Sequence, residues 1–153
     1  MAILGIIPAR FASTRLPGKP LLSVTGKTLI EHVVDAARRS TRLDRIIVAT
    51  DDIRIADAVT AFGGEAVMTR ADHPSGTDRV AEVAAAIPEA EIVVNLQGDE
   101  PEVLGPTLDL VVDLLRDDPD APMATIATPI RDPAVYLDPA GVKVVRASSG
   151  RAL

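Results

Sequence analysis

The side chains best suited to chemistry in this chain are three cations near its start. Arg10, Arg15 and Lys19 fall within IPARFASTRLPGKPLL (Ile7–Leu22), at the end of an apolar run. The first 30 residues hold four cations and no carboxylate, whereas the other 123 residues carry a net charge of −10. A compact positive loop on an acidic protein attracts a multiply charged small anion to one place. A nucleic-acid backbone would require a broad basic face, so the pattern indicates a phosphate-rich small molecule.

The same loop can bring its backbone close to a ligand. Ser13 and Gly18 are small, and Pro8, Pro17 and Pro20 stiffen the loop, which lowers the entropy cost of holding its cations around an anion. The sequence has neither the full glycine pattern of a P-loop nor a G-x-G-x-x-G dinucleotide fingerprint after the first strand. Both common phosphate cradles are therefore excluded.

A candidate metal ligand follows a second apolar run. Ile92–Leu96 leads directly into QGDEP (Gln97–Pro101). Asp99 could hold Mg²⁺ through one or two oxygens while substrate phosphates complete the octahedron. The alternative is that Asp99 or Glu100 caps the helix that starts near Pro106. The distance along the chain to that helix favours metal binding.

A third polar stretch, DHPSGTDR (Asp72–Arg79), runs into a helix. Ser75, Thr77 and backbone N–H groups at a helix start can hydrogen-bond a base or a phosphate. Ordinary N-capping by Thr77 or Asp78 explains the same residues equally well, so both interpretations stay open. His73 is interpreted as a loop residue rather than a catalytic base.

The elements that must position these residues are predicted by hydrophobic patterning. Short β-branched runs alternate with helical periodicity, which predicts an α/β protein with a doubly wound, mostly parallel sheet and helices on both faces. In such sheets ligands bind at the carboxyl ends of the strands, where the polar stretches above lie. Asp51-Asp52, after the second strand, is interpreted as the cap of the next helix. The strands are predicted at Ala2–Ile7, Arg45–Thr50, Glu65–Met68, Ile92–Leu96, Ala124–Thr128 and Val142–Arg146, with helices near 29–37, 55–62, 80–84 and 106–115.

Composition sets the broad class of the protein. A length of 153 residues suits one domain. Aromatic residues make up 2% of the chain, which leaves no stacking platform for single-stranded nucleic acid. The absence of cysteine fits the cytoplasm. No apolar run has the length of a membrane span, and Pro8 and Arg10 make the start unlike a signal peptide. We expect no membrane or nucleic-acid partner.

With these segments in view, the sequence resembles the 3-deoxy-manno-octulosonate cytidylyltransferase (CMP-KDO synthetase) family. The resemblance covers essentially the whole chain, in family order and with family-like spacing. Related sialic-acid-type synthetases share the idea of the early loop but match STRLPGKPL and NLQGDEP less closely. The matching segments are IPARFASTRLPGKPL (Ile7–Leu21), IIVATDD (Ile46–Asp52), MTRADHPSGTDR (Met68–Arg79), NLQGDEP (Asn95–Pro101) and VKVV (Val142–Val145).

The resemblance implies a Rossmann-like nucleotidyltransferase fold and a specific reaction. The family joins CTP and 3-deoxy-D-manno-octulosonate (KDO) to give CMP-KDO and pyrophosphate, with Mg²⁺, for lipopolysaccharide-type surface polysaccharides. Carried over, Asp99 would hold Mg²⁺ and Gln97 would touch the nucleotide or the sugar acid. The catalytic residues would be the three cations that grip the triphosphate, Arg10, Arg15 and Lys19. The nucleotide-binding residues would be Ala9, Arg10, Ser13, Arg15, Lys19, Ser75 and Gly76.

The end of the chain departs from the family pattern. After the predicted strand Val142–Arg146, Ser148-Ser149-Gly150 predicts a turn, and the three remaining residues are too few to pair with that strand. Family members continue for roughly another hundred residues, a domain-scale length. In relatives that portion supplies much of the sugar-acid pocket, the homodimer contact and a second metal-binding aspartate.

We therefore expect residues 1–153 to form one nucleotidyltransferase domain that is incomplete at its C-terminus. Two alternatives to KDO transfer stay open. The chain could belong to a CMP-sugar synthetase for another acidic sugar, or it could be a non-catalytic nucleotide-binding fragment.

Overall fold

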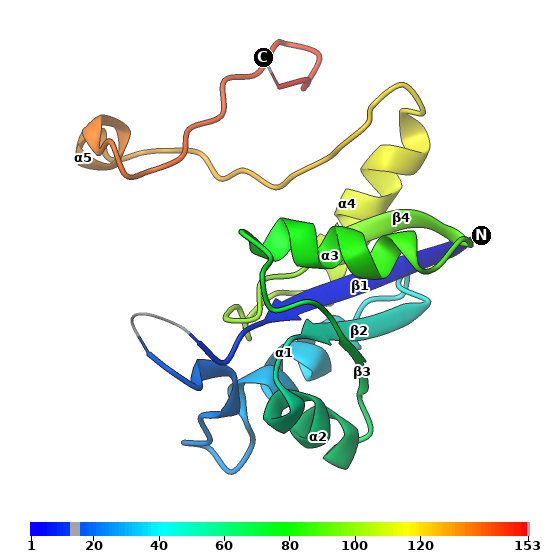
Figure 1. Ribbon diagram of the computed structural model, residues 1–153. Coiled ribbons are helices and arrows are strands. Elements are labelled where there is room, and N and C mark those ends of the chain that lie inside the picture. The colour runs from blue at the N-terminus through cyan, green and yellow to red at the C-terminus, as the bar shows by residue number, and fades with distance from the viewer. Residues whose placement is uncertain (13–15, 153) are drawn as a thin grey trace.

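A parallel β-sheet forms the centre of the computed structural model, which describes residues 1–12 and 16–152 (Figure 1). Within the described residues the sheet has the strand order β3-β2-β1-β4, and every neighbouring pair is parallel. The predicted α/β class is thus confirmed, with β1 in the interior of the sheet. The strands are β1 (Ala2–Ala9), β2 (Arg45–Thr50), β3 (Glu65–Met68) and β4 (Ala90–Asn95).

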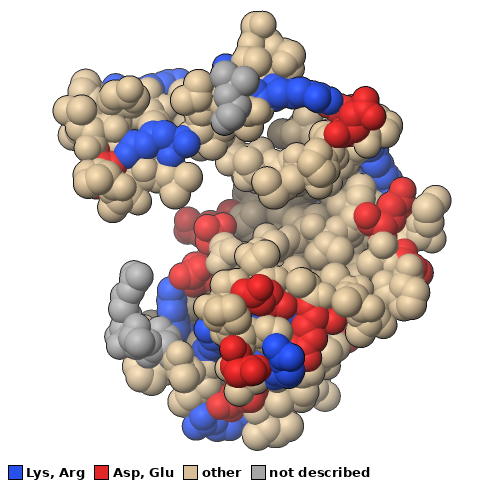
Figure 2. All heavy atoms as spheres, turned by 45° about the horizontal axis from the view of Figure 1, so that its top comes forward, with Lys and Arg blue, Asp and Glu red and all other residues tan. Residues whose placement is uncertain are grey.

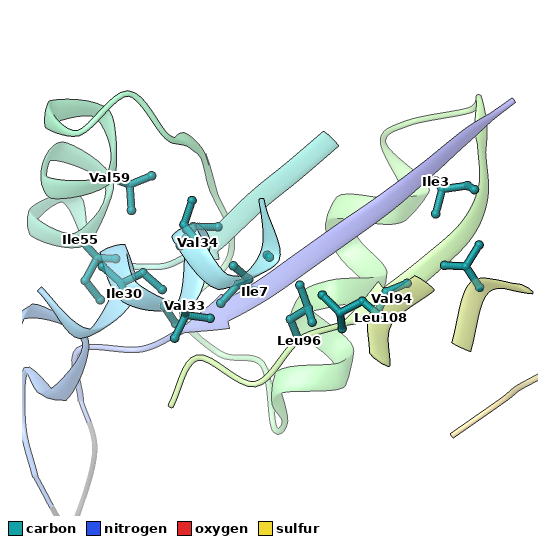
Figure 3. Packing of buried hydrophobic residues seen from close by; sticks show 14 of the residues in the cluster. Ile3, Ile7, Ile30, Val33, Val34, Ile55, Val59, Val94, Leu96 and Leu108 are labelled. Atoms are coloured by element: carbon teal, nitrogen blue, oxygen red, sulfur yellow. The ribbon is translucent and has the colours of Figure 1, made fainter. Parts of the chain in front are cut away.

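Helices cover both faces of this sheet, as predicted. On one face, a cluster of aliphatic side chains joins the sheet to α1 (Leu29–Ala37), α2 (Ile53–Ala61) and α4 (Gly105–Asp117). Figure 3 shows side chains of α1 beside Ile7 of β1, Ile55 of α2 beside Ile30 of α1, and Leu108 of α4 beside Val94 of β4. None of the helices in the described part of the chain is both long and apolar enough to span a bilayer.

The other face of the sheet is covered by α3 (Gly76–Ala85). Its Val80 and Val83 pack on Leu4 and Ile6 of β1 in a second, smaller cluster. Alternate side chains of β1 therefore enter different clusters, and nearly every residue of the strand is buried. This explains why its sequence is a continuous apolar run and lacks the alternation typical of a half-exposed strand.

Side-chain caps fix where α2 and α3 begin. Asp52 accepts from the N–H of Arg54 at the start of α2, so the capping prediction is confirmed for Asp52. At the start of α3 the cap is Ser75, which accepts from the N–H of Asp78. The predicted caps Thr77 and Asp78 are wrong because α3 begins at Gly76, which places both residues inside the first turn.

The start of α4 has no side-chain cap. The residue in the capping position is Leu104, which makes no side-chain hydrogen bond to the helix. Neither Asp99 nor Glu100 is therefore the cap of α4, and the competing interpretation of these carboxylates is removed. Gly105 instead fits tightly against the end of α1, since a Cβ on it would lie 2.3 Å from the carbonyl oxygen of Arg39.

The segment that follows α4 departs most from prediction. It runs apart from the sheet and contains one short helix, α5 (Pro133–Leu137), which was not predicted (Figure 1). The strands predicted at Ala124–Thr128 and Val142–Arg146 are wrong: within the described residues no strand lies beside either segment. Val142 is 94% exposed. The neighbouring valines, Val144 and Val145, favour a strand, but strand propensity does not produce a strand where no second strand is available for pairing.

The predicted turn near the end of the chain is confirmed. Gly150 donates its N–H to the carbonyl oxygen of Ala147 at 3.0 Å, and Ala147 donates to Arg151 at 2.9 Å. Arg146 and Ala152 then form a single antiparallel bridge. The residues after the turn therefore form one antiparallel bridge, although they were expected to be too few to pair at all.

Asp109 anchors α4 to the segment that follows α1. Its carboxylate accepts from the N–H of Thr41 at 2.9 Å, the hydroxyl of Thr41 at 2.8 Å and the N–H of Arg42 at 3.2 Å. The hydroxyl of Ser40 donates to the same group. Partial burial raises the pKa of Asp109, but the hydrogen bonds from Ser40 and Thr41 outweigh it, so the pKa lies below its ordinary value.

We expect Asp109→Asn to lower the free energy of unfolding by about 1–3 kcal/mol at pH 7, because several donors lose a charged acceptor. A carboxyl with a depressed folded-state pKa stabilises above its unfolded pKa of about 3.9, and that stabilisation is lost as the pH falls through the folded value. The difference from wild type should therefore shrink only below about pH 4. Urea denaturation at pH 7 and pH 3 measures it, with the exposed Asp57→Asn as control. An equal loss at both pH values would contradict the assignment.

Candidate functional site

The carboxyl end of β1 is where the polar loops meet. A Cβ on Gly76 would lie 3.2 Å from Cγ of Pro8, and a Cβ on Gly98 would lie 2.9 Å from the carbonyl oxygen of Pro8. The second distance is a backbone-to-backbone approach that a larger residue could not make without displacing one chain. The start of α3 and the loop after β4 therefore both lie against β1, and the predicted convergence at the strand ends is confirmed.

β1 itself runs two residues further than predicted. Pro8 pairs with Ala49 and Ala9 with Thr50 of β2, so the first loop begins at Arg10. Ala9 is 3% exposed and belongs to the larger core cluster, so little of this residue is open to a ligand.

The cationic loop is closed at its base. The N–H of Gly18, whose φ is 69°, donates to the carbonyl oxygen of Phe11 at 2.8 Å. The Phe11 ring contacts Gly18, and the guanidinium of Arg54 stacks over the ring at 3.3 Å from its centroid. Ser13 and Arg15 lie outside the described residues.

The two described cations of the loop reach different neighbouring loops. Nη2 of Arg10 donates to the carbonyl oxygen of His73 at 2.8 Å, on the loop that leads into α3. Nζ of Lys19 donates to Oδ2 of Asp99 at 2.6 Å, on the loop after β4. Positive charge is thus placed on both sides of the end of β1.

The pair formed by Lys19 and Asp99 lies at the surface. The side chains are 39% and 52% exposed, respectively. An ion pair in this setting contributes roughly 0–1 kcal/mol to stability, because water screens both charges and holding two side chains costs entropy. The pair therefore contributes little to holding the fold together, and separating the two side chains would cost little.

The first turn of α3 is pre-organised at the same place. The Ser75 hydroxyl both accepts from the N–H of Asp78 and donates to its carboxylate, which lowers the pKa of Asp78. Gly76 is the first residue of the helix, so the helix N-terminus and its partial positive charge lie at the end of β1. Ser75 and Gly76 are brought to the site, with the Ser75 side chain committed to capping.

Gln97 and Asp99 are exposed and follow β4 directly. Asp99 also borders a hollow of 580 Å³ that reaches from this loop to Ile126 in the segment after α4. Figure 2 shows the molecule hollowed between that segment and the main body, with acidic side chains at the edge. Among the described residues no group of three or more His, Cys, Asp or Glu could hold a metal ion.

Two polar pairs behind the site, each with one buried partner, were not predicted. Arg79 is 0% exposed and donates to Asp51 at 2.8 Å and to the hydroxyl of Thr69, which joins α3 to the ends of β2 and β3. His73, 8% exposed, bonds Glu82 of α3, so its interpretation as a loop residue holds. Arg79 and His73 belong to the polar stretch Asp72–Arg79 described above. Nothing in the sequence indicates that Asp51 is the partner of Arg79 or that Glu82 is the partner of His73.

A family model described as cytidylyltransferase matches residues 4–153. The chain belongs to the cytidylyltransferase family. It is 50% identical to the 3-deoxy-manno-octulosonate cytidylyltransferase of Syntrophotalea carbinolica over 153 residues, and 53% identical to that of Syntrophobacter fumaroxidans over 155. In both cases all of this chain is covered. The chain spans about three fifths of the length of these curated relatives, 61% and 62%.

Solved structures agree with this family assignment. The structure of CMP:2-keto-3-deoxy-manno-octonic acid synthetase complexed with CTP matches with a TM-score of 0.91 and 44% identity, covering 100% of this chain and 63% of the other. A cytidylyltransferase from Leptospira borgpetersenii matches with a TM-score of 0.66 and 28% identity, covering 77% and 50%. The Rossmann-like nucleotidyltransferase fold expected for this cytidylyltransferase-family chain is thereby confirmed.

We expect Gly98→Ala to lower the free energy of unfolding by about 1–3 kcal/mol, because the added methyl group would press on the backbone of Pro8 and displace the loop that carries Asp99. Gly141→Ala is the matched control, since its nearest neighbour is the flexible end of Lys143 at 3.4 Å. Urea denaturation of both variants measures the difference. Wild-type stability in Gly98→Ala would show that the approach to Pro8 is looser than described.

Proposed function

We propose that this chain is the CTP-binding part of an enzyme that joins CTP and KDO to give CMP-KDO and pyrophosphate. The observation that carries the proposal is the Lys19–Asp99 pair, a cation and a carboxylate 2.6 Å apart beside the end of β1. The names of the relatives and the CTP complex of a 44% identical protein support the choice of substrates. The cytoplasm is the proposed compartment, in keeping with a chain that has no cysteine.

The reaction requires charge control more than proton transfer. The anomeric hydroxyl oxygen of the sugar acid bonds to the α-phosphorus of CTP, the α-phosphorus bond to the β-phosphate oxygen breaks, and pyrophosphate leaves while the hydroxyl proton is released. Catalysis of such a step comes mainly from positioning and electrostatic stabilisation. The site fits this need, because the His73 imidazole is held by Glu82 and is not presented as a base.

The cations have the roles that this step requires. Arg10 and Lys19 would bind the triphosphate. Arg10 reaches the loop before α3 and Lys19 reaches the loop after β4, so they lie on opposite sides of the end of β1. Arg15 is proposed to join them and Ser13 to contact the nucleotide. Ser75, Gly76 and the backbone of Ala9 would also face the nucleotide, and Gln97 would touch the nucleotide or the sugar acid.

Asp99 fits the chemistry of a Mg²⁺ ligand. It is an exposed carboxylate that lies 2.6 Å from the ammonium group of Lys19. Mg²⁺ prefers oxygen ligands and keeps a small number from the protein, with phosphate oxygens and water completing the shell. When bound there, the ion would neutralise phosphate charge. Magnesium is therefore part of the proposal, with Asp99 as its protein ligand.

Two alternatives concern the sugar and turnover. An enzyme for another acidic sugar would use the same CTP site. No residue of the described loops is assigned to the sugar acid only, so these loops do not distinguish KDO from another acidic sugar. The second alternative is a nucleotide-binding fragment without turnover. Measuring pyrophosphate release with CTP, KDO and Mg²⁺ separates these cases. Sustained release would reject the hypothesis of a fragment without turnover. Release with a different sugar acid, and none with KDO, would reject KDO as the substrate.

We expect Lys19→Ala to lower kcat/KM for CTP by about 10²–10³, the scale of losing one charge-stabilising donor. If the chain binds CTP without turnover, calorimetry should show weaker CTP binding in this variant instead. Lys27→Ala is the matched control, because Lys27 pairs with Asp35 and Glu31 on α1 and not with the site. Equal effects of the two substitutions, or none from Lys19→Ala, would remove the triphosphate role.

A further inference from the structure

Glu82 bonds both ends of residues 70–73, a stretch of the loop that precedes α3. Its carboxylate accepts from the N–H of Arg70 at 3.2 Å and bonds the imidazole Nε2 of His73. Arg70 and His73 begin and end a stretch of four residues that leads toward the start of α3. The hydrogen bond to His73 is the main cause of a lowered pKa of Glu82, so the carboxylate is held in its charged form. One side chain on α3 thus fixes the course of this loop.

The backbone of that loop in turn holds a cation of the site. The carbonyl oxygen of His73 accepts from Nη2 of Arg10 at 2.8 Å. His73 is 8% exposed, whereas the side chain of Glu82 is 35% exposed. The His73 imidazole is therefore buried, whereas the Glu82 carboxylate that holds it is partly open to water. The position of the Arg10 guanidinium then follows from the position of His73, and that follows from Glu82.

We propose that Glu82 is a positioning residue that acts through His73 to hold the Arg10 guanidinium in place for the triphosphate of CTP. The inference rests on the proposed function, since it assigns Glu82 to the same site. Glu82 does not contact the ligand; its contribution is to orient a group that does. A stability role alone would make Glu82 one ion-pair partner among many, with no special link to Arg10.

The test is a double-mutant cycle on anion binding. Calorimetry would measure the binding of inorganic triphosphate and of CTP, both with Mg²⁺, to wild type, Glu82→Ala, Arg10→Ala and the double variant. We expect Glu82→Ala to weaken binding roughly tenfold, the scale of one misaligned charge-assisted hydrogen bond, and to have no further effect once Arg10 is absent. The same loss in both backgrounds would show a general structural effect and overturn the proposal.

Two further variants keep this cycle interpretable. Glu31→Ala, which removes an ion-paired glutamate from the exposed side of α1, should bind both ligands like wild type. Glu82→Gln can keep both hydrogen bonds through its amide oxygen but loses the negative charge, so it should bind more tightly than Glu82→Ala. It replaces Glu82→Ala in the cycle if the alanine variant does not fold. Binding by Glu82→Gln no better than by Glu82→Ala would count against positioning through these two hydrogen bonds.

A spectroscopic readout separates this proposal from the proposed function. The chain has two histidines, so the imidazole nitrogens of His73 are readily assigned by NMR, and the Arg10 guanidinium should show slowed exchange. Glu82→Ala should abolish that slowing and shift the His73 signals. If wild type bound neither ligand, the proposed function would fail, and an Arg10 signal lost in Glu82→Ala would still support positioning. An Arg10 signal unchanged in Glu82→Ala would refute it.

Discussion

The approach of two glycines to Pro8 is the constraint on which the site depends. Gly98 brings a backbone within contact of the Pro8 carbonyl oxygen, and Gly76 brings the start of α3 against the Pro8 ring. These contacts place loops that are far apart in sequence around the end of one interior strand. Because β1 is buried on both faces by aliphatic side chains, the point on which the loops rest is rigid. The loops that carry Arg10 and Lys19 therefore rest on a fixed frame.

The charges at this frame differ in how tightly they are held. Arg79 and Asp51 form a buried pair that joins strand ends to α3, and removing one partner of such a pair is costly. Lys19 and Asp99 form an exposed pair that costs little to open. The buried pair behind the loops supports the geometry, and under the proposed function the exposed pair in front would exchange its internal contact for phosphate and metal. This division would suit the proposed polyphosphate site.

Prediction from the sequence succeeded where the signal was local. The apolar runs of β1 and β2 and the periodicity of α1 and α4 are properties of short segments, and so is the convergence of polar loops at strand ends in a parallel sheet. The residues after α4 were predicted as strands because Val142–Arg146 is rich in valine, but a strand requires a neighbour that the segment itself cannot specify. Glu82 and Arg54 were missed for the same reason: their importance comes from contacts with His73 and Phe11, which the local sequence does not specify.

The most direct measurement is a crystal structure of this chain with CTP and Mg²⁺ bound. The triphosphate should lie between Lys19 and Asp99, with the ammonium group on phosphate oxygens, the carboxylate on the metal, and the direct contact of 2.6 Å between them opened. Arg10 should keep its bond to the His73 carbonyl oxygen while it meets the phosphates. A triphosphate bound elsewhere, with the Lys19–Asp99 pair intact, would contradict the assignment of this site.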